Sequence, residues 1–263
     1  MRPTRPGERA PVHQPFTVAL TFRGDLDFFL KGRGQGPIVR VLKERSSVKD
    51  VIEACGVPHP EVDLILVDGR RVDFSFVLEG NERVDVYPVR WEPSVFPEDR
   101  LQIHRFERFV ADGHLGKLTT NLRLLGFDVA YDQGAQDRQL IDIMMGEDRA
   151  LLTRDRRLLM HGVVQTAYFP RSQNAMEQTL EVIRRFDLSS LLAPFTRCLR
   201  CNAPLEQVDK AEVMEKLEPL TRIYYAAFRR CPNCAQIYWR GSHFDKLTAR
   251  VEEIRANLTV AVQ

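Results

Sequence analysis

The apolar residues of the first third of the chain follow a strand-like rhythm. Within residues 16–90, apolar and polar positions alternate in the short segments FTVALTF, IVRVLKE, LILVDG and RVDVYPV, and each segment predicts a strand. One segment, SSVKDVIEACG, has helical spacing instead, with Ser46 or Ser47 before its apolar residues and Gly56 just past its end. A hairpin followed by a helix and further strands is typical of a small α+β unit.

A second rhythm follows a proline-rich stretch from Pro88 to Pro97, which we interpret as a linker. Strand-like segments (ERFVA, FDVAY, ALLT and VVQTAYF) now alternate with helix-like segments (HLGKLTTNLRLLG, RQLIDIMMGED, RRLLMHG and NAMEQTLEVIRRF). This alternation predicts a parallel sheet with helices packed on it. At the C-terminus, one stripe of apolar residues predicts a helix that packs back onto this domain or onto a partner: Phe244, Leu247, Val251, Ile254 and Leu258.

Composition supports a folded protein with more than one domain. The 263 residues are 44% hydrophobic and 28% charged, which is enough apolar material for two or more cores. The longest apolar runs are far short of the roughly 20 residues that span a bilayer, so no membrane partner is expected. Residues 1–14 carry charge and proline but lack the apolar centre of a signal peptide. We therefore expect a soluble, cytoplasmic protein with a short disordered leader.

The α+β unit resembles the β-grasp, ubiquitin-like domains of the sulfur-carrier type. Those carriers end in a Gly-Gly tail that is thiocarboxylated, whereas here the last strand runs into YPVRWEPSVFPEDR. The resemblance therefore implies a docking or scaffolding role and a protein partner, and sulfur-carrier function is disfavoured. The glycine-rich segment at residues 31–36 is interpreted as a hairpin loop, since no helix opens directly after it to form a phosphate loop.

Three aspartates follow the ends of strands in the predicted parallel sheet, and a fourth opens a helix. Asp112 directly follows ERFVA, Asp132 directly follows FDVAY, and Asp155 lies two residues after ALLT. Asp137 opens the helix that leads into the third strand. Because ligands of open α/β sheets gather at the carboxyl ends of the strands, we expect Asp112, Asp137 and Asp155 to face one pocket, with Asp132 close by. The alternative for each of them is a helix N-cap, a position that Asp prefers.

Several carboxylates at one edge predict a site for a hard metal ion. Ionised carboxylates repel one another and raise each other's pKa unless a cation joins them. Their oxygen atoms suit Mg²⁺ or Mn²⁺ rather than zinc. Such a cluster is suited to phosphodiester hydrolysis, in which the metal activates a water and neutralises charge on the phosphate. Thr153 is placed to hydrogen-bond a carboxylate or a water, although a strand threonine needs no such role.

Basic residues flank the predicted carboxylate site. Five of them are candidates for binding the substrate phosphate, since Arg grips a phosphate through two hydrogen bonds and Lys acts as a point charge. The alternative is ordinary surface charge, in keeping with a net charge of +2 that predicts no strong overall field. The five candidates are Lys117, Arg138, Arg154, Arg156 and Arg157.

Two Cys-x-x-Cys pairs give the strongest single signal in the sequence. Cys198 and Cys201 form the first pair, and Cys231 and Cys234 form the second. Two such knuckles place four thiolates around one tetrahedral zinc ion, which leaves no position for water, so we predict a structural zinc site in a zinc ribbon. A redox dithiol is the alternative for either pair alone. The fifth cysteine, Cys55, stands alone in a helical pattern and is interpreted as a buried core thiol.

The predicted ribbon combines basic and aromatic residues. Residues 196–246 contain nine Lys or Arg against six acidic residues, with aromatic rings interleaved among them. Cations beside stacking rings suit single-stranded RNA. The alternative, which we expect to apply to at least half of the rings, is burial in a small zinc domain that has little other core. For His243, in WRGSH, an RNA contact and a structural role both stay open.

The order of these motifs resembles that of the Mut-seven C-terminal RNase domain, a branch of the PIN-like nucleases. The resemblance rests on FVADGHLGKLTTNLRLLGFDVAYD, DRQLIDIMMGEDRALLTRDRRLL, RCLRCNAPL and CPNCAQIYWRGSH, and covers residues 106–248. It implies that Asp112, Asp137 and Asp155 match the acids of the nuclease site, with Asp132 matching less closely. It also implies hydrolysis that leaves a 5′-phosphate and a 3′-hydroxyl, and an N-terminal ubiquitin-like module as in bacterial members.

These expectations define an α/β protein that acts as a metal-dependent ribonuclease, with a structural zinc ribbon that aids RNA binding. RNA such as tRNA or ribosomal RNA is the expected substrate class. The alternative is a noncatalytic RNA-binding or adaptor protein that retains the nuclease fold. The expected parts are a leader (1–14), an α+β β-grasp domain (15–92), a linker (93–104), a PIN-like parallel-sheet α/β/α domain (105–195), a zinc ribbon (196–248), and a C-terminal helix and tail (249–263).

Overall fold

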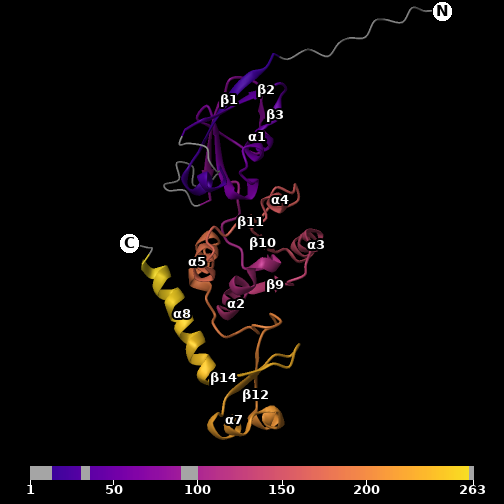
Figure 1. Cartoon of the computed structure of the whole chain (residues 1–263), viewed down its shortest axis with the longest axis vertical. Helices are drawn as coiled ribbons and strands as arrows, with labels where there is room; N and C mark the ends of the chain where they lie inside the picture. The colour runs from indigo at the N-terminus through magenta and orange to yellow at the C-terminus, as the bar shows by residue number, and fades with distance from the viewer. Residues whose placement is uncertain (1–13, 31–35, 90–99, 261–263) are drawn as a thin grey trace, which may run out of the picture. The chain divides into compact units, whose positions relative to one another are not determined.

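The computed structural model divides the chain into two compact units, one ending at Gln102 and the other beginning at Ile103 (Figure 1). It describes residues 14–30, 36–89 and 100–260. Three sequence predictions fall largely outside these residues: the disordered leader, the glycine-rich hairpin loop and most of the proline-rich linker.

The first unit is built around a mixed five-stranded sheet with the order β2-β1-β7-β4-β5. Its central pair, β1 and β7, is parallel, and the remaining neighbours are antiparallel. This arrangement confirms the predicted α+β β-grasp domain. The elements are β1 (Phe16–Phe22), β2 (Ile38–Leu42), β4 (Val62–Val67), β5 (Arg70–Val72), β7 (Arg83–Pro88), the small pair β3 (Ser46–Ser47) and β6 (Val77–Leu78), α1 (Val48–Ala54), and the 3₁₀ turns Gly24–Phe29 and His59–Glu61.

Helix α1 begins and ends at the predicted residues. The Ser47 hydroxyl accepts the backbone N–H of Asp50 at 3.1 Å, and Gly56 follows the helix with a φ of +101°, which an L side chain rarely adopts. Cys55 at the end of the helix is buried, as expected for a core thiol. The predicted strand LILVDG is wrong at its end, because Asp68 and Gly69 both have positive φ and form the two-residue turn of the β4–β5 hairpin.

The first unit extends past the proline-rich stretch. Leu101 N donates to the Asp63 carbonyl at 2.9 Å, and Gln102 N donates to Asp63 Oδ1 at 2.9 Å. Arg100 forms an ion pair of 2.8 Å with the buried Asp63 carboxylate. Residues 100–102, which the sequence assigned to the linker, therefore pack on this sheet.

The second unit contains a parallel four-stranded sheet with the order β11-β10-β8-β9. The alternating strands and helices were predicted, but β11 is shorter than VVQTAYF, because a turn in which Val164 N donates to the His161 carbonyl takes up its start. The elements are β8 (Arg108–Ala111), the 3₁₀ turn Gly113–Leu115, α2 (Gly116–Leu124), β9 (Asp128–Tyr131), α3 (Asp137–Glu147), β10 (Ala150–Leu152), α4 (Arg156–Leu159), β11 (Ala167–Tyr168), α5 (Ala175–Arg185) and the 3₁₀ turn Ser189–Leu191.

Helices cover both faces of this sheet. Helix α2 packs against α5 and β9, whereas α3 contacts β8 and β10 (Figure 1). The chain steps from β8 to β9 in one direction and from β9 back across to β10 in the other, so right-handed crossovers place α2 and α3 on opposite faces.

The long C-terminal helix α8 (Ser242–Val260) lies beside α5 (Figure 1). Val251 and Ile254 are buried in the core of the parallel-sheet domain, with Leu247 and Leu258 partly buried against it. The predicted packing of this helix onto the domain is thus confirmed. The helix begins at Ser242, inside the range expected for the zinc ribbon. Among the described helices, none is long and apolar enough to cross a membrane.

Between α5 and α8 the chain forms a small antiparallel sheet, β12-β13-β14. A compact core of its own lies beneath it and includes Val208 and Phe228. The elements are β12 (Glu206–Val208), α6 (Lys210–Val213), the 3₁₀ turn Met214–Lys216, α7 (Pro219–Tyr224), β13 (Phe228–Arg230) and β14 (Ile237–Trp239). The segment between the two cysteine pairs contains the short helices α6 and α7.

Candidate functional site

Asp112 and Asp155 are joined through one threonine at the carboxyl edge of the parallel sheet. Strands β8 and β10 are neighbours, and Asp112 N donates to the Leu152 carbonyl at 3.0 Å. Thr153 is fully buried, and its hydroxyl donates to Asp112 Oδ2 at 2.7 Å. The same hydroxyl oxygen accepts the backbone N–H of Asp155 at 3.0 Å. The prediction that Thr153 hydrogen-bonds a carboxylate is confirmed.

This pair of strands is also where the chain connections diverge. After β8 the chain turns towards β9, and after β10 it turns towards β11 on the other side of the sheet. Crevices at such switch points, outside the carboxyl ends of the strands, are the usual ligand sites of open α/β sheets. Asp112 and Asp155 lie at this point.

The loop after β9 is packed tightly against the loop after β8. Any side chain at Gly113 would clash with the backbone carbonyl of Gln133. The Tyr131 hydroxyl donates to the Gly113 carbonyl at 2.8 Å, and a Cβ at Gly116 would lie only 2.7 Å from the Tyr131 hydroxyl oxygen. The two glycines therefore allow the Asp132 loop to approach the Asp112 loop. The sequence interpretation did not single out these residues, since only the fold brings them together.

The four aspartates differ in their local partners. Asp155 caps α4, because its Oδ1 accepts the N–H groups of Arg157 and Leu158 at 2.7 and 3.3 Å. Asp132 is exposed and accepts the Gly134 N–H at 2.9 Å. Asp155 is therefore a helix N-cap, as the alternative interpretation of the sequence expected.

Asp112 and Asp137 do not cap their helices. Asp112 is half-buried at the start of the 3₁₀ turn and directs Oδ2 to Thr153 instead. Asp137 is exposed in the first turn of α3, whose N-terminus is closed by Gln136 and Gln139, with Gln139 Oε1 accepting the Gln136 N–H at 2.9 Å. These two carboxylates are left available to a ligand.

The acidic side chains are not drawn into a tight cluster. Within the described parts of the chain, no three His, Cys, Asp or Glu ligand atoms outside the four-cysteine group lie within 4.8 Å of one another. Thr153 links the Asp112 carboxylate to the backbone N–H of Asp155.

The five candidate phosphate-binding residues lie on the helices and loops around this edge. Lys117, Arg138 and Arg157 are exposed, in the first turns of α2, α3 and α4 respectively. Arg154 is partly buried, donates to the Ser172 carbonyl at 2.9 Å and lies over the Phe169 ring. Arg156 is also partly buried, and desolvation lowers the pKa of its guanidinium.

The four cysteines of the two knuckles form a compact group. The Sγ atoms of Cys198 and Cys234 are 3.6 Å apart, those of Cys201 and Cys231 are 3.2 Å apart, and all four lie within 4.8 Å of one another. Tetrahedral zinc with Zn–S bonds of about 2.3 Å separates its sulfurs by about 3.8 Å. The donor set and its spacing fit a structural zinc ion.

The two knuckles have the same backbone geometry. In each, the first Sγ accepts the N–H of the second cysteine at 3.5 Å, and the first cysteine's carbonyl accepts the N–H four residues later. The residue after the second cysteine, Asn202 or Ala235, has a positive φ. This matched pair of turns supports the predicted zinc ribbon.

The Tyr238 hydroxyl group lowers the pKa of a cysteine in the first knuckle. Burial raises the pKa of the Cys198 thiol, but hydrogen bonds from the Tyr238 hydroxyl, at 3.1 Å, and from backbone N–H groups outweigh it and lower the pKa to about 6. Burial raises the pKa of the Cys201 thiol to about 12. The Tyr238 hydroxyl group therefore favours the thiolate form of Cys198.

The first knuckle is fixed to the parallel-sheet domain by a buried polar network. Arg123 donates to the carbonyl of Val129 in β9 and to the carbonyls of Leu199 and Arg200 in the knuckle. Asn202 donates to Asp128 Oδ1 at 2.7 Å and accepts the Val129 N–H at 3.0 Å. The ribbon is thus docked at the start of β9, the end of the sheet opposite the aspartates.

Asp128 is the centre of this network. It forms ion pairs with the buried Arg149 at 2.6 Å and with Arg197 at 3.6 Å. Burial acts to raise the pKa of Asp128, but the hydrogen bonds from Arg149 and Asn202 outweigh it and lower the pKa below its ordinary value. No pattern in the sequence marks these partners.

Comparisons with known proteins agree with this division of the chain. The family model described as Mut7-C RNAse domain matches residues 107–251, more than half of the chain, and the one described as Mut7-C ubiquitin matches residues 16–93. No curated protein matches. The solution structure of the Haloferax volcanii HVO 2177 protein matches with 18% sequence identity and a TM-score of 0.25, over 35% of this chain and 100% of that chain.

Proposed function

Because this chain belongs to the Mut7-C RNase domain family, we propose that it is a metal-dependent ribonuclease with its site at the carboxyl edge of the parallel sheet. The observation that carries the proposal is the hydrogen-bonded link from Asp112 through Thr153 to Asp155 at the switch point of the sheet. The buried threonine holds the Asp112 carboxylate and the Asp155 backbone N–H at the edge where open α/β sheets bind ligands, which supports the proposal.

In the proposed site, Asp112, Asp137 and Asp155 hold Mg²⁺ or Mn²⁺, with Asp132 contributing from the neighbouring loop. Hard carboxylate oxygens are the donors these ions prefer. When bound, such an ion activates water and neutralises the charge that develops on the phosphate. Asp112 Oδ1 and both oxygens of Asp137 have no hydrogen-bond partner among the described residues, so these atoms are available to a cation.

The chain's own residues orient the substrate in this proposal. Thr153 fixes the orientation of the Asp112 carboxylate through its hydrogen bond to Oδ2. The phosphodiester is held by cations on the surrounding helices and loops, and in-line hydrolysis leaves a 5′-phosphate and a 3′-hydroxyl. The proposed phosphate-binding residues are Lys117, Arg138, Arg154, Arg156 and Arg157.

The four cysteines hold zinc in a structural role in this proposal, and the ribbon extends the RNA-binding surface. Structured RNA such as tRNA or ribosomal RNA, in the cytoplasm, is the proposed substrate class. The ubiquitin-like unit is proposed to dock a protein partner. Its edge strand β2 supports this role, because Val39 and Val41 expose 63% and 66% of their surface there. Replacing both valines with Lys should abolish that docking without changing cleavage of a free oligonucleotide.

The central test measures cleavage of end-labelled RNA by the full chain with Mg²⁺, with Mn²⁺ and without divalent ions. Asp112→Asn and Asp155→Asn should each abolish metal-dependent cleavage while zinc content and the melting temperature stay unchanged. Asp148→Asn is the matched control, since Asp148 lies at the other end of the sheet with a φ of +50°, which Asn tolerates. Full activity in both site variants would overturn the assignment.

A noncatalytic RNA-binding or adaptor protein is the second candidate. It is favoured by the local roles of Asp132 and Asp155 and by the absence of a tight acidic cluster among the described residues. In that case, RNA should be bound without any products in every metal condition. The mobility of labelled RNA on a native gel, beside a denaturing gel of the same sample, separates the two candidates.

A further inference from the structure

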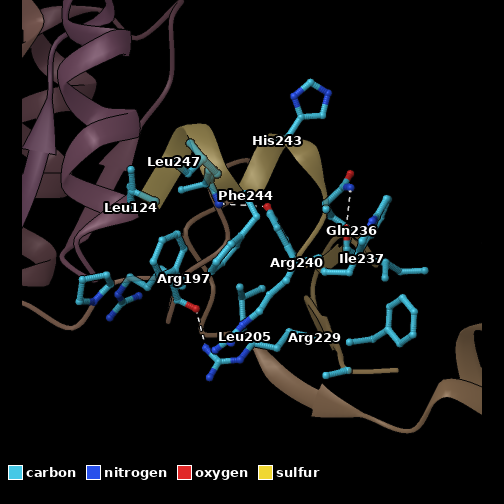
Figure 2. Close-up of a pocket in the computed structure, with 18 of the residues that line it drawn as sticks. Leu124, Arg197, Leu205, Arg229, Gln236, Ile237, Arg240, His243, Phe244 and Leu247 are labelled. Atoms are coloured by element: carbon cyan, nitrogen blue, oxygen red, sulfur yellow. Dashed lines mark hydrogen bonds between the residues drawn. The ribbon is translucent and has the colours of Figure 1, made fainter. Parts of the chain in front are cut away.

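A cavity of about 770 Å³ lies between the ribbon sheet and the start of α8 (Figure 2). Strands β13 and β14 line one side, and the first turn of α8 lines another. Leu124, at the C-terminal end of α2, also lines it, whereas Asp112 precedes the N-terminal end of that helix. Nine helical residues, about 13 Å of rise, separate the two regions.

The cavity is lined by positive and not by negative residues. Arg197, Arg229 and Arg240 contribute to its wall, and none of its lining residues is Asp or Glu. Arg197 is already paired with Asp128. Arg229 donates to the Phe195 carbonyl, and the Arg240 guanidinium lies over the Phe244 ring at 5.5 Å from its centre. Among the described residues, neither arginine forms an ion pair with a carboxylate. Two uncompensated guanidinium groups therefore face this space, and an anionic occupant would neutralise them.

Aromatic rings form the other part of the wall. Trp239 exposes 37% of its surface, and the rings of Phe195 and Phe244 lie 4.5 Å apart with an angle of 33°. Gly241 gives Trp239 its position, because a Cβ there would lie 2.7 Å from the indole Nε1. His243 lines the cavity at its edge, and its ring points away from the other labelled side chains in Figure 2.

We propose that this cavity binds one unpaired nucleotide of single-stranded RNA. The base stacks on the exposed face of Trp239, and Arg229 and Arg240 bind the adjoining phosphate. Stacking surfaces beside unpaired cations are the common features of single-strand binding sites. The volume lies within the range of about 300–1,000 Å³ typical of small-ligand pockets. The identification of the ligand as RNA rests on the proposed function. The expectation that the ligand is anionic and aromatic rests only on the arginines and rings that line the cavity.

Binding is measured apart from cleavage. The chain has two tryptophans, so Trp91→Phe leaves Trp239 as the single indole reporter. This variant, combined with Asp112→Asn and kept free of added divalent ions, is titrated with an octauridylate and, separately, with a hexaglutamate peptide. The oligonucleotide should quench the fluorescence and saturate, and the peptide should not. Quenching by the peptide alone would overturn the proposal in favour of an acidic protein partner.

Variants identify the cavity residues. Arg229→Ala and Arg240→Ala should each weaken oligonucleotide binding about tenfold or more and reduce the slope of log K against log salt by about 0.7. Arg255→Ala is the matched control, because Arg255 lies on α8 outside the cavity lining and pairs with the exposed Glu252. Gly241→Ala tests the Trp239 position without changing charge, and anisotropy of a labelled oligonucleotide should show weaker binding.

Unchanged affinity in Arg240→Ala and Gly241→Ala, at an unchanged melting temperature, would overturn the cavity assignment even if the wild-type chain cleaves RNA. Conversely, if the Asp112→Asn variant still cleaves RNA, the catalytic proposal fails. The cavity assignment would still stand if the oligonucleotide quenches the fluorescence of Trp239. As a single substitution, without Trp91→Phe or Asp112→Asn, Arg240→Ala should raise KM for an RNA that reaches from the aspartates to the cavity. The value of kcat should stay within about twofold of the wild-type value. An RNA of two nucleotides should show no such change.

Discussion

The hydroxyl group of Thr153 donates a hydrogen bond of 2.7 Å to Oδ2 of Asp112, and the two residues lie at the ends of adjacent parallel strands. The threonine is fully buried, so water does not replace this bond. Its oxygen also accepts the backbone N–H of Asp155. The orientation of the Asp112 carboxylate and the position of the Asp155 backbone therefore depend on one side chain that is neither charged nor a proposed metal ligand.

Thr153→Val should weaken the affinity of the proposed site for Mn²⁺ without unfolding the domain. Valine has nearly the same shape but leaves Asp112 Oδ2 without its donor. Losing such a support typically costs about 10- to 100-fold in metal affinity or activity. We expect the Mn²⁺ concentration for half-maximal cleavage to rise by about that factor. Thr153→Ser, which keeps the hydroxyl, should restore most of the affinity, and equal defects in both variants would argue for packing alone.

Gly113→Ala should destabilise the second unit, because the added methyl group would clash with the Gln133 carbonyl in a backbone that cannot easily move. Overpacking of this kind costs about 1–3 kcal/mol. Gly146→Ala is the control, since the same methyl group there, in α3, meets nothing within 4 Å and should be neutral or mildly stabilising. Urea denaturation of both variants measures the difference, and equal midpoints would contradict the close loop contact.

Removing zinc should unfold the ribbon and weaken the second unit. Structural zinc supplies on the order of 10 kcal/mol in small zinc domains. Cys231→Ser should therefore lower the zinc content from one ion per chain to none and lower the melting temperature of the second unit. Cys55→Ser is the comparison, since it changes a thiol in the other unit and should leave zinc content unchanged. Elemental analysis together with calorimetry checks both.

Asp128→Asn should destabilise the docking of the knuckle by about 1–3 kcal/mol, since it removes a charge that Arg149 and Arg197 share. The wild-type contribution should also depend on pH. The pKa of Asp128 is lowered in the folded state, so its stabilising effect is complete above the ordinary aspartate pKa of about 3.9 and is lost as pH falls through the lower folded value. Melting curves from pH 7 down to pH 3 should show this loss in the wild type and a smaller one in Asp128→Asn.

Local signals in the sequence were sufficient for much of the fold. Ser47 and Gly56 mark the ends of α1 because capping depends on residues within one turn. The cysteine pairs mark the ribbon because a knuckle needs only four residues. The placement of Asp112 and Asp155 at one edge follows from strand direction alone, since parallel strands end together.

Other features depend on contacts between residues far apart in the chain. Asp128 and Asn202 are 74 positions apart, and their hydrogen bond follows from where the ribbon returns to the sheet. N-capping of α3 by Asp137, which was the alternative to a metal-binding role, does not occur, because Gln136 and Gln139 close that helix. The cavity at Trp239 needs α8 to cross the ribbon, which no local pattern specifies.

Helix α8 connects the cavity to the core of the parallel-sheet domain, since its first turn lines the former and Val251 and Ile254 are buried in the latter. A fragment that stops after the second cysteine pair would contain every proposed catalytic aspartate and every zinc ligand. It would nevertheless expose the apolar surface that these two residues cover. A fragment that contains the second unit should therefore run from Ile103 through the end of α8, and shorter fragments should aggregate.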